Sequence, residues 1–479
     1  MKKILLWRFY MFFDKKFINQ TVIIFTILTF CLFPKGYSQV NNQIVHLTLQ
    51  SSIDRALQEN NQIQLSYFSL KKAQWDKYQA WSQLFPAVHF STRYMHIDDR
   101  TFAERDFRRY LPPEFSDQIP QTVFQESYYS AIDMSIPIFN GAIINGLRIA
   151  NTNKKIANKV NESTTSNTLH QVVTSYLNVL KSIKLLELQK KFTDLAKLNF
   201  EKAQRQESAG RFSENEVLFW EIDYQRQRSA LTSSESTLRT TENILSNLLE
   251  MDINVQFEVD TTLPKSIINK SEEIALMSND KVLTMVNLKE NDLIEANAAL
   301  SAAQSQQHIS KLMYRNTQSS FLPTVSFGYS YAWRENNTFE LDDYSPETYM
   351  INLSIPLFTS FQNLSKARSA YYDYRQHEEN YQDQLNNTRL FLSEVANRII
   401  ELKTQLQLSK LNVKYSENNY RIIEQQKDRG LISNIDFINT KLSLQNSELD
   451  EINIQYDFIS AIIEMYYLLG NLDDILMIN

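Results

Sequence analysis

The sequence predicts a mainly α-helical protein that also contributes strands to a membrane β-barrel, with one structural plan used twice along the chain. Only 7 of its 479 residues are glycine and 10 are proline, and so few chain breakers favour long uninterrupted helices. Four short segments alternate apolar and polar residues, which is the pattern of strands. Several short motifs recur in the same order in the two halves, which indicates an internal repeat.

The first 38 residues have the pattern of an export signal. A basic region is followed by the apolar run 22–33 and then by Gly36-Tyr37-Ser38, after which we expect cleavage. An uncleaved membrane anchor is the alternative, although the run is short for a span. Cys31, the only cysteine, lies inside this signal, so the mature chain is expected to have no disulfide. No later stretch has the roughly 18 apolar residues of a transmembrane helix, so insertion into a membrane would require β-structure.

Three short motifs of the first half return in the second half, about 220 residues later. The pairs are Leu84-Phe85-Pro86 with Phe321-Leu322-Pro323, Ser135-Ile136-Pro137 with Ser354-Ile355-Pro356, and Ala209-Gly210-Arg211 with Arg429-Gly430-Leu431. Because the order is kept, we expect a first repeat over residues 39–250 and a second over 282–479. The segment 251–281 alternates from Ile253 to Val259 before Pro264, so we expect a short strand and a linker there.

Each repeat has one pair of alternating segments. They predict strands at about 86–96 and 128–139 in the first half, and at about 323–334 and 348–358 in the second. Alternation over about ten residues fits a tilted outer-membrane strand with one face toward lipid and the other toward a polar lumen. We expect five residues in the lumen: His89, Arg93, Asp133, Arg334 and Asn352. A soluble sandwich with one hydrated face is the alternative.

Four strands cannot close a membrane barrel by themselves, because the smallest such barrels have about eight. Open strand edges are not tolerated in lipid. The strands must therefore be shared among copies of the chain. Two copies would supply eight strands and three would supply twelve.

Apolar residues follow an alternating spacing of three and four on both sides of each tip glycine, along 172–186, 217–248, 392–406 and 435–466. This rhythm over several heptads indicates coiled-coil packing. The first pre-tip helix is expected from about Ile143 to Ser208, roughly 100 Å at 1.5 Å per residue, a length that suits a tunnel. The stripes after the tips, which begin at Val217 and Ile435, are offset by 218 residues and the glycines by 220. Either the two turns differ in phase or the frame of one stripe is wrong.

The two glycine-centred tips carry signals for ending one helix and starting the next. Gly210 and Gly430 stand where a left-handed residue commonly caps a helix. A serine follows each glycine after three residues, with an acid three further on: Ser213 with Glu216, and Ser433 with Asp436. This is a capping-box pattern, so each tip is predicted as helix, tight turn and antiparallel helix.

The sequence contains no constellation typical of an enzyme or of a metal site. None of the six histidines has a His or Cys partner at metal-ligand spacing, and we find no nucleotide-binding or hydrolase motif. The net charge of −6 is spread along the chain, which argues against nucleic acid as a partner. We expect no catalysis, no cofactor and no bound metal.

The sequence resembles the TolC family of outer-membrane efflux proteins over nearly the whole mature chain. The resemblance rests on the opening Leu47-Thr48-Leu49 with Ile53, Ala56-Leu57 and Asn60, on the doubled Leu-Pro and Ile-Pro strand ends, and on the two tips. It implies a homotrimer with a twelve-stranded barrel in outer-membrane lipid and a twelve-helix tunnel in the periplasm. It also implies a periplasmic adaptor and an inner-membrane pump as partners, for efflux or type I secretion, with the pump supplying the energy.

In that family the helix tips meet the adaptor and form the closed entrance. The resemblance assigns adaptor contact to Gly210, Arg211, Phe212, Ser213, Gly430, Leu431, Ile432 and Ser433. It places the entrance at Asp436 and Asn439. Asn439 stands where a second acid is expected and Ile432 where an arginine is expected, which weakens the case for a strong acidic ring or the same latch. Asp436 is equally well explained as a capping residue.

Two other functions stay open at this stage, and the cargo is not indicated. A periplasmic or surface coiled-coil structural protein without channel activity would explain the heptads and treat the strands as an ordinary sheet. An exported enzyme has no supporting motif.

Overall fold

The computed structural model describes residues 45–116, 118–120, 122–252, 257–335, 347–429 and 431–476. The chain divides into two units, one of residues 1–45 and 255–258 and the other of residues 46–254 and 259–479. The described residues of the first unit belong to two short strands, β1 (Val45–Leu47) and β4 (Phe257–Val259). The expected signal, residues 1–38, lies outside the described residues. The other described elements belong to the second unit.

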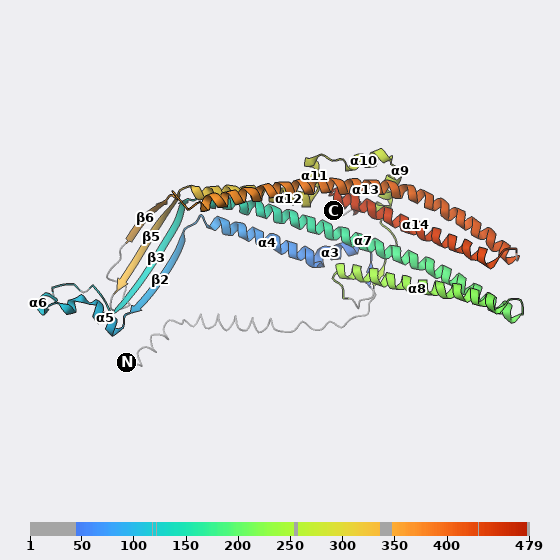
Figure 1. Ribbon diagram of the computed structural model, residues 1–479, viewed down its shortest axis with the longest axis horizontal. Coiled ribbons are helices and arrows are strands. Elements are labelled where there is room, and N and C mark those ends of the chain that lie inside the picture. Colours follow the sequence, from blue (N-terminus) through green and yellow to red (C-terminus); the bar gives the residue numbers. More distant parts are fainter. Residues whose placement is uncertain are drawn as a thin grey trace, which may run out of the picture. The chain divides into compact units, whose positions relative to one another are not determined.

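Four antiparallel strands form one sheet in the order β2-β3-β5-β6 (Figure 1). They are β2 (Ala87–His96), β3 (Glu126–Phe139), β5 (Thr324–Glu335) and β6 (Glu347–Ser354). The central pair, β3 and β5, comes from the two different halves of the chain, so the halves meet in the middle of the sheet. β2 and β6 are the edge strands, and each presents backbone N–H and C=O groups to a further strand.

The five residues expected to line a lumen share one face of the sheet. His89 lies opposite Asp133, whose Oδ1 accepts a hydrogen bond from the Ser330 hydroxyl at 2.7 Å. His89, Asp133 and Ser330 form one row across the sheet. Counted along the strands and their paired positions, the other three residues lie an even number of positions from this row, so they are on the same face: Arg93, Arg334 and Asn352. For Arg334 this rests on the backbone, because its side chain lies outside the described part. The opposite face exposes apolar side chains, namely Val88, Phe90, Ile351 and Leu353.

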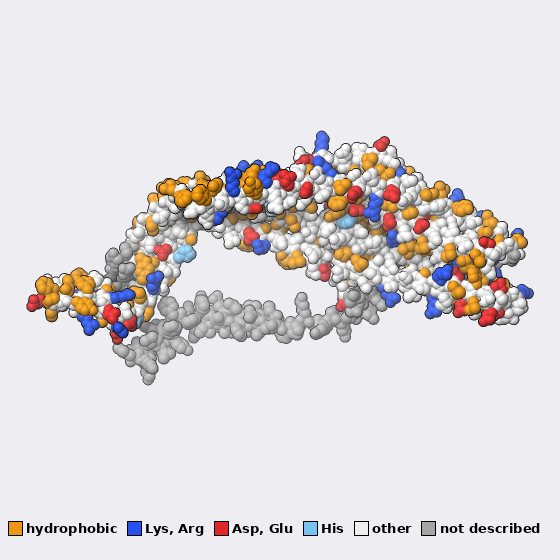
Figure 2. Space-filling view, viewed as in Figure 1, with side chains coloured by type: hydrophobic (Ala, Val, Ile, Leu, Met, Phe, Trp, Pro, Cys, Tyr) orange, Lys and Arg blue, Asp and Glu red, His pale blue; other side chains and the backbone are white. Residues whose placement is uncertain are grey.

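The last strand is shorter than the sequence predicts. β6 ends at Ser354, not near 358, and Pro356 follows in irregular backbone. Proline cannot donate a backbone hydrogen bond. The matching Pro137 stays within β3, where a register shift lies between Pro137 and Phe139. Figure 2 shows apolar side chains gathered where the sheet meets the helices, where Ile355, Leu357, Phe358 and Phe361 are exposed.

The connection between β2 and β3 is partly helical. It contains α5 (Asp99–Arg105), a 3₁₀ turn η1 (Phe107–Tyr110) and α6 (Pro113–Ser116). Asp98 caps α5 by accepting the N–H of Thr101 at 3.0 Å. The connection between β5 and β6, residues 336–346, lies outside the described residues.

Two helical hairpins of matching length make up most of the unit (Figure 1). The first joins α7 (Gly141–Ser208, 68 residues) to α8 (Glu214–Leu248, 35 residues), and the second joins α13 (Gln362–Asp428, 67 residues) to α14 (Asn434–Leu468, 35 residues). Shorter helices precede the strands: α3 (Leu49–Glu59) and α4 (Asn61–Ser82) in the first half, and α11 (Glu290–Ala296), α12 (Ala298–Gln318) and the 3₁₀ turn η2 (Ser319–Phe321) in the second. Because α12 packs on both α7 and α13, it joins the halves.

The segment between the halves is more helical than expected. It contains α9 (Lys265–Leu276) and α10 (Asn279–Val286), and Ile253 lies outside the described residues. The helices form because their apolar faces are covered: α9 packs on α14 and α15 (Leu472–Leu476), and α10 packs on α13. Ahead of α9, the carbonyl oxygen of Asp260 lies 2.7 Å from the Tyr176 hydroxyl. Burial raises the pKa of Tyr176, so this hydroxyl stays a donor.

The heptad stripes form the contact faces of the hairpins, with one correction. Along α7 and α13 the buried stripe positions are Val172, Tyr176, Val179, Leu186, Leu392, Val395, Ile399 and Leu402. In α14 the stripe does not begin at Ile435, which is 61% exposed. It begins at Phe437 and Ile438, 2% and 8% exposed. Phe437 takes the apolar position beside the tip, so the frame assigned from Ile435 was wrong at its first position.

Gly470 follows the end of α14 and lies against Ala296, the last residue of α11. Gly470 has φ +71°, and a Cβ there would lie 1.8 Å from the carbonyl oxygen of Ala296. Its N–H donates to the carbonyl of Tyr467 and the N–H of Asn471 donates to that of Tyr466, at 3.0 and 2.9 Å. These bonds end α14 in a left-handed turn. Both the backbone angle and the close contact require glycine here.

Candidate functional site

The first tip turns at Gly210, which has φ +70°. The N–H groups of Gly210 and Arg211 donate to the carbonyls of Glu207 and Gln206, at 2.7 and 2.8 Å, and so satisfy the last turn of α7. A Cβ on Gly210 would have no atom within 4 Å. The turn therefore needs glycine for its backbone angle and not for space.

The start of α8 is held by a reciprocal cap. The backbone N–H of Ser213 donates to Oε2 of Glu216 at 2.8 Å, and the N–H of Glu216 donates to the Ser213 hydroxyl oxygen at 3.4 Å. Ser213 is thus a helix cap, as its sequence pattern predicts. Its carboxylate partner, Glu216, is engaged within the tip itself.

The second tip caps α14 in a similar way. The N–H of Asp436 donates to the Ser433 hydroxyl oxygen at 3.1 Å, and that hydroxyl donates to Oδ2 of Asp436 at 2.6 Å. Asp436 and Asn439 are both exposed. The structure shows Asp436 in its capping role, while a role for it or for Asn439 at an entrance stays a prediction. Gly430 lies outside the described residues.

The remaining tip residues divide into inward and outward groups. Phe212 and Ile432 pack against a buried cluster beneath the tips, formed by Ala203, Val217, Trp220, Phe437 and Ile438. Arg211 and Leu431 are exposed, Leu431 by 68%. The side chains offered to solvent at the tips therefore include one cation and one large apolar group.

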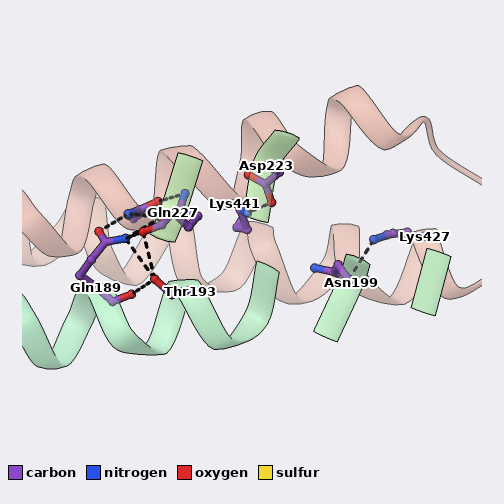
Figure 3. Close-up of polar contacts among 8 residues, drawn as sticks. Gln189, Thr193, Asn199, Asp223, Gln227, Lys427 and Lys441 are labelled. Carbon is purple, nitrogen blue, oxygen red and sulfur yellow. Dashed lines mark hydrogen bonds and ion pairs between the residues drawn. The ribbon is translucent and has the colours of Figure 1, made fainter. Parts of the chain in front are cut away.

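Lys427 is held against this cluster by aromatic rings of both hairpins. Its Nζ lies 3.9 Å from the ring centroid of Trp220 and 3.7 Å from that of Phe437. It also lies 3.4 Å from Oδ1 of Asn199, as Figure 3 shows. A cation over two ring faces is attracted by both. Lys427, near the end of α13, thus connects its helix with α7, α8 and α14.

A pocket of about 550 Å³ lies between the two tips. We call it the intertip pocket; its lining includes Lys202, Arg211, Glu216, Trp220, Lys427 and Ile432. Residues of both turns and of the helices that flank them form its walls. It is therefore a shared feature of the two hairpins.

Above the tips, three glutamine side chains from three helices form a closed ring (Figure 3). Gln189 of α7 donates to Gln227 of α8 at 2.8 Å, Gln227 donates to Gln445 of α14 at 3.1 Å, and Gln445 donates to Gln189 at 3.0 Å. Thr193 donates its hydroxyl to the Gln189 carbonyl at 2.8 Å. All four side chains are buried, so the ring satisfies amide groups that are out of reach of water.

A buried ion pair lies between the ring and the tips. Lys441 of α14 and Asp223 of α8 are 0% and 4% exposed, and Nζ lies 2.5 Å from Oδ2. The other carboxylate oxygen, Oδ1 of Asp223, is buried and accepts no hydrogen bond from the described residues. The pair, the ring and the contact between Lys427 and Asn199 together form the interhelical polar contacts of Figure 3.

Sequence reasoning found only part of this arrangement. Gln227 and Gln445 fall on the spacing of three and four of the stripes along 217–248 and 435–466, but the contact between them was not predicted. Asp223 and Lys441 immediately precede stripe positions and were overlooked. The available signal was the 218-residue offset of the stripes, because the Gln227–Gln445 and Asp223–Lys441 contacts both join residues 218 apart. The two capping serines, Ser213 and Ser433, are 220 residues apart. Residues that meet across the two stripes are therefore offset by two positions relative to the caps.

Within the described residues, no group of three or more His, Cys, Asp or Glu side chains is arranged to hold a metal ion. The helices among these residues include none with the length and apolar character needed to cross a bilayer.

Comparisons with known proteins agree with this architecture. A family model described as outer membrane efflux protein matches residues 52–249 and 290–471, one block in each half. A comparison with curated protein sequences found no match. The fold is similar to that of the CmeC outer membrane channel of Campylobacter jejuni, with a TM-score of 0.76 and 13% identity over 88% of this chain and 86% of that one.

Two further solved structures share the fold. The outer membrane protein VceC of Vibrio cholerae has a TM-score of 0.74 and 15% identity, covering 88% of this chain and 96% of that one. The open state of the MtrE outer membrane channel of Neisseria gonorrhoeae has a TM-score of 0.68 and 13% identity, covering 88% and 89%. At identities of 13–15%, these structures show that the fold is shared. The family model, in contrast, matches the sequence itself in both halves of the chain. The chain belongs to the outer membrane efflux protein family.

Proposed function

We propose that three copies of this chain form an exit duct, with a twelve-stranded barrel in outer-membrane lipid and the helical hairpins as a periplasmic tunnel. The observation that carries the proposal is the four-stranded sheet with two open edges, which bears one polar face and one exposed apolar face. Such a sheet is stable in lipid only when other copies pair with β2 and β6. The duct conducts passively, and a pump in the inner membrane supplies the energy.

An uncovered heptad stripe on α13 supports assembly with further copies. Its exposed members are Leu408, Leu411, Tyr415 and Ile422, at 57%, 65%, 70% and 52% exposure. Their spacing of three, four and seven places them on one helix face. Aligned apolar side chains of this size mark an interface, and a neighbouring copy would cover them.

Engineered cysteines test the shared barrel, because Cys31 is the only native cysteine. A cysteine at Ser91 of β2, combined in turn with cysteines along β6, should give disulfide-linked dimers and trimers in outer-membrane fractions for one or two β6 positions. Planar bilayers containing the purified protein should show ion conductance. Monomers alone together with an absence of conductance would instead favour a coiled-coil structural protein without channel activity.

We further propose that the tips dock a periplasmic adaptor. The two turns end the helical hairpins, and Leu431 is exposed there as an apolar contact. Replacing Leu431 with aspartate should weaken docking, because the charge would be desolvated on binding. The readout is copurification of the adaptor with detergent-extracted channel, with Ile435→Asp as the matched change at an exposed isoleucine within α14. Equal adaptor recovery from Leu431→Asp and the unsubstituted chain would contradict docking at this residue.

A further inference from the structure

The charged residues of the four strands are divided between the two faces of the sheet. Arg93 and Arg334 occupy the polar face, where the register sets them on either side of Tyr129 in one row. The opposite, apolar face carries the glutamates of the described strands: Glu126, Glu335 and Glu347. Arg334 and Glu335 are assigned from the backbone register. The polar face of the described strands therefore carries their arginines and none of their glutamates.

Arg93 is not engaged by a neighbouring side chain. It is exposed, and its guanidinium forms no ion pair or hydrogen bond with another described residue. The carboxylate on the same face, that of Asp133, accepts a hydrogen bond from the Ser330 hydroxyl at 2.7 Å and lies in the row of His89. His89 is four positions before Arg93, which is about 13 Å along a strand. Asp133 is thus too far away to pair with Arg93, and the positive charge is available to a solute.

In the proposed trimer these positions surround the lumen. We call them the arginine belt: Arg93 and Arg334 of each copy, which together carry twice the charge of the opposing Asp133. Twelve strands about 4.8 Å apart and tilted by about 40° form a barrel roughly 24 Å across. Every point inside it lies within about 12 Å of the wall, while the screening length at 0.1 M salt is about 10 Å. The field of the belt therefore extends through much of the lumen at low salt.

We propose that the arginine belt makes the barrel end of the duct selective for anions. Solutes that bear carboxylate, phosphate or sulfate groups then leave more readily than cations of similar size. The proposal deepens the proposed function and rests on the shared barrel. Guanidinium groups suit this role, because they stay charged and donate paired hydrogen bonds to oxyanions. Rings of such side chains select anions in other pores, and a lining of one sign raises the local concentration of oppositely charged solutes.

The test measures the ion selectivity of the purified trimer in planar bilayers of a neutral phosphatidylcholine. A KCl gradient around 0.1 M gives the ratio of chloride to potassium permeability. Arg93→Gln removes one belt charge per copy and should lower this ratio at least about twofold. Arg93→Lys keeps the charge and should leave the ratio close to the parent value. Asp133→Asn removes the opposing charge and should raise it.

Two controls test the assignment of the faces and the electrostatic cause. Glu126→Gln removes a charge from the opposite face and should leave the ratio unchanged. At 1 M salt, where the screening length is about 3 Å, the differences among the variants should become small. If Arg93→Gln gives no channels, the parent alone decides: inorganic triphosphate added on the barrel side should block the current at a concentration at least about tenfold lower than spermidine, a trivalent cation.

The outcomes separate the belt from the duct. An unchanged ratio in Arg93→Gln, or a fall with Arg93→Lys as large as with Arg93→Gln, would overturn anion selection by the belt and leave the duct intact. So would a rise with Glu126→Gln equal to the fall with Arg93→Gln, or a stronger block by spermidine than by triphosphate. Absence of conductance in the parent would instead refute the proposed duct.

Discussion

The buried pair of Lys441 and Asp223 leads to a quantitative prediction for the variant Lys441→Met. Methionine fills nearly the space of the lysine stem but has no charge. The substitution leaves the Asp223 carboxylate 4% exposed with both oxygens unpaired, because Oδ1 already lacks a hydrogen bond among the described residues. The expected effect is therefore that of a buried carboxylate without a counterion.

Removing one partner of a buried ion pair typically destabilises a protein by about 3–5 kcal/mol. Since about 1.4 kcal/mol corresponds to a factor of ten, local opening of α8 from α14 should become about 10²-fold to about 4 × 10³-fold more frequent. Hydrogen exchange of the intact oligomer, followed by mass spectrometry, reports this opening directly. Amides around Asp223 and Lys441 should exchange faster by that factor, and amides of the sheet should not.

The double variant Asp223→Leu/Lys441→Met separates lost pairing from lost packing. It removes both charges and should exchange within about tenfold of the parent, because apolar replacement of a whole buried pair is often neutral. Lys184→Met is the matched surface control, since Lys184 and Glu187 form an exposed pair worth little. The reasoning fails if Lys441→Met changes exchange less than tenfold, or if the double variant opens as readily as the single one.

Three further predictions concern single positions. Gly470→Ala should lower the thermal midpoint of the oligomer strongly, because its Cβ would overlap the Ala296 carbonyl, whereas Gly146→Ala, in open space within α7, should raise stability by about 0.5–1 kcal/mol. Gln189→Leu should cost about 1–3 kcal/mol, because the buried amides of Gln227 and Gln445 each lose their bond to Gln189 and keep only their bonds to each other, which hydrogen exchange in α7 and α14 would measure. Because burial raises the pKa of Tyr176 above 10.0, its contribution to stability is present below pH 10 and is lost as pH rises toward the raised value, so Tyr176→Phe should show a smaller fall in thermal midpoint between pH 8 and 11.

Features governed by neighbouring residues could be predicted from the sequence. The length of α7 follows from the absence of glycine and proline between Gly146 and Gly210, and the caps at Ser213 and Ser433 follow from an acid three residues later. In each case the partner groups lie within one helical turn. Such interactions do not depend on how distant segments pack.

The same local motif gave different results where its surroundings differed. Ile-Pro occurs near the end of both second strands, yet Pro137 stays in β3 and Pro356 falls outside β6. β5 continues along β3 past the proline, with Ser326 opposite Pro137 and Val325 opposite Phe139, so it holds the β3 backbone there. β6 is an edge strand with one partner in the protomer, and the missing N–H of proline ends its pairing.

The polar contacts between hairpins could not be predicted, because each needs residues from separate helices. A glutamine on a heptad stripe fits equally well as a solvent-facing residue or as a buried one. Only the packing of α7, α8 and α14 shows that three such amides complete a ring. Likewise a lysine beside a stripe is expected in water, and Lys441 is fully buried because Asp223 lies opposite.

These polar contacts explain how two similar hairpins keep one alignment. Apolar heptad faces tolerate sliding, because a shift by one turn still sets apolar residues against apolar residues. The Gln227–Gln445 and Asp223–Lys441 contacts both join residues 218 apart, so they specify the same register twice. A slip of one turn would unpair buried amides and a buried charge together, at a cost of several kcal/mol. We therefore infer that the polar contacts set the register of α8 against α14.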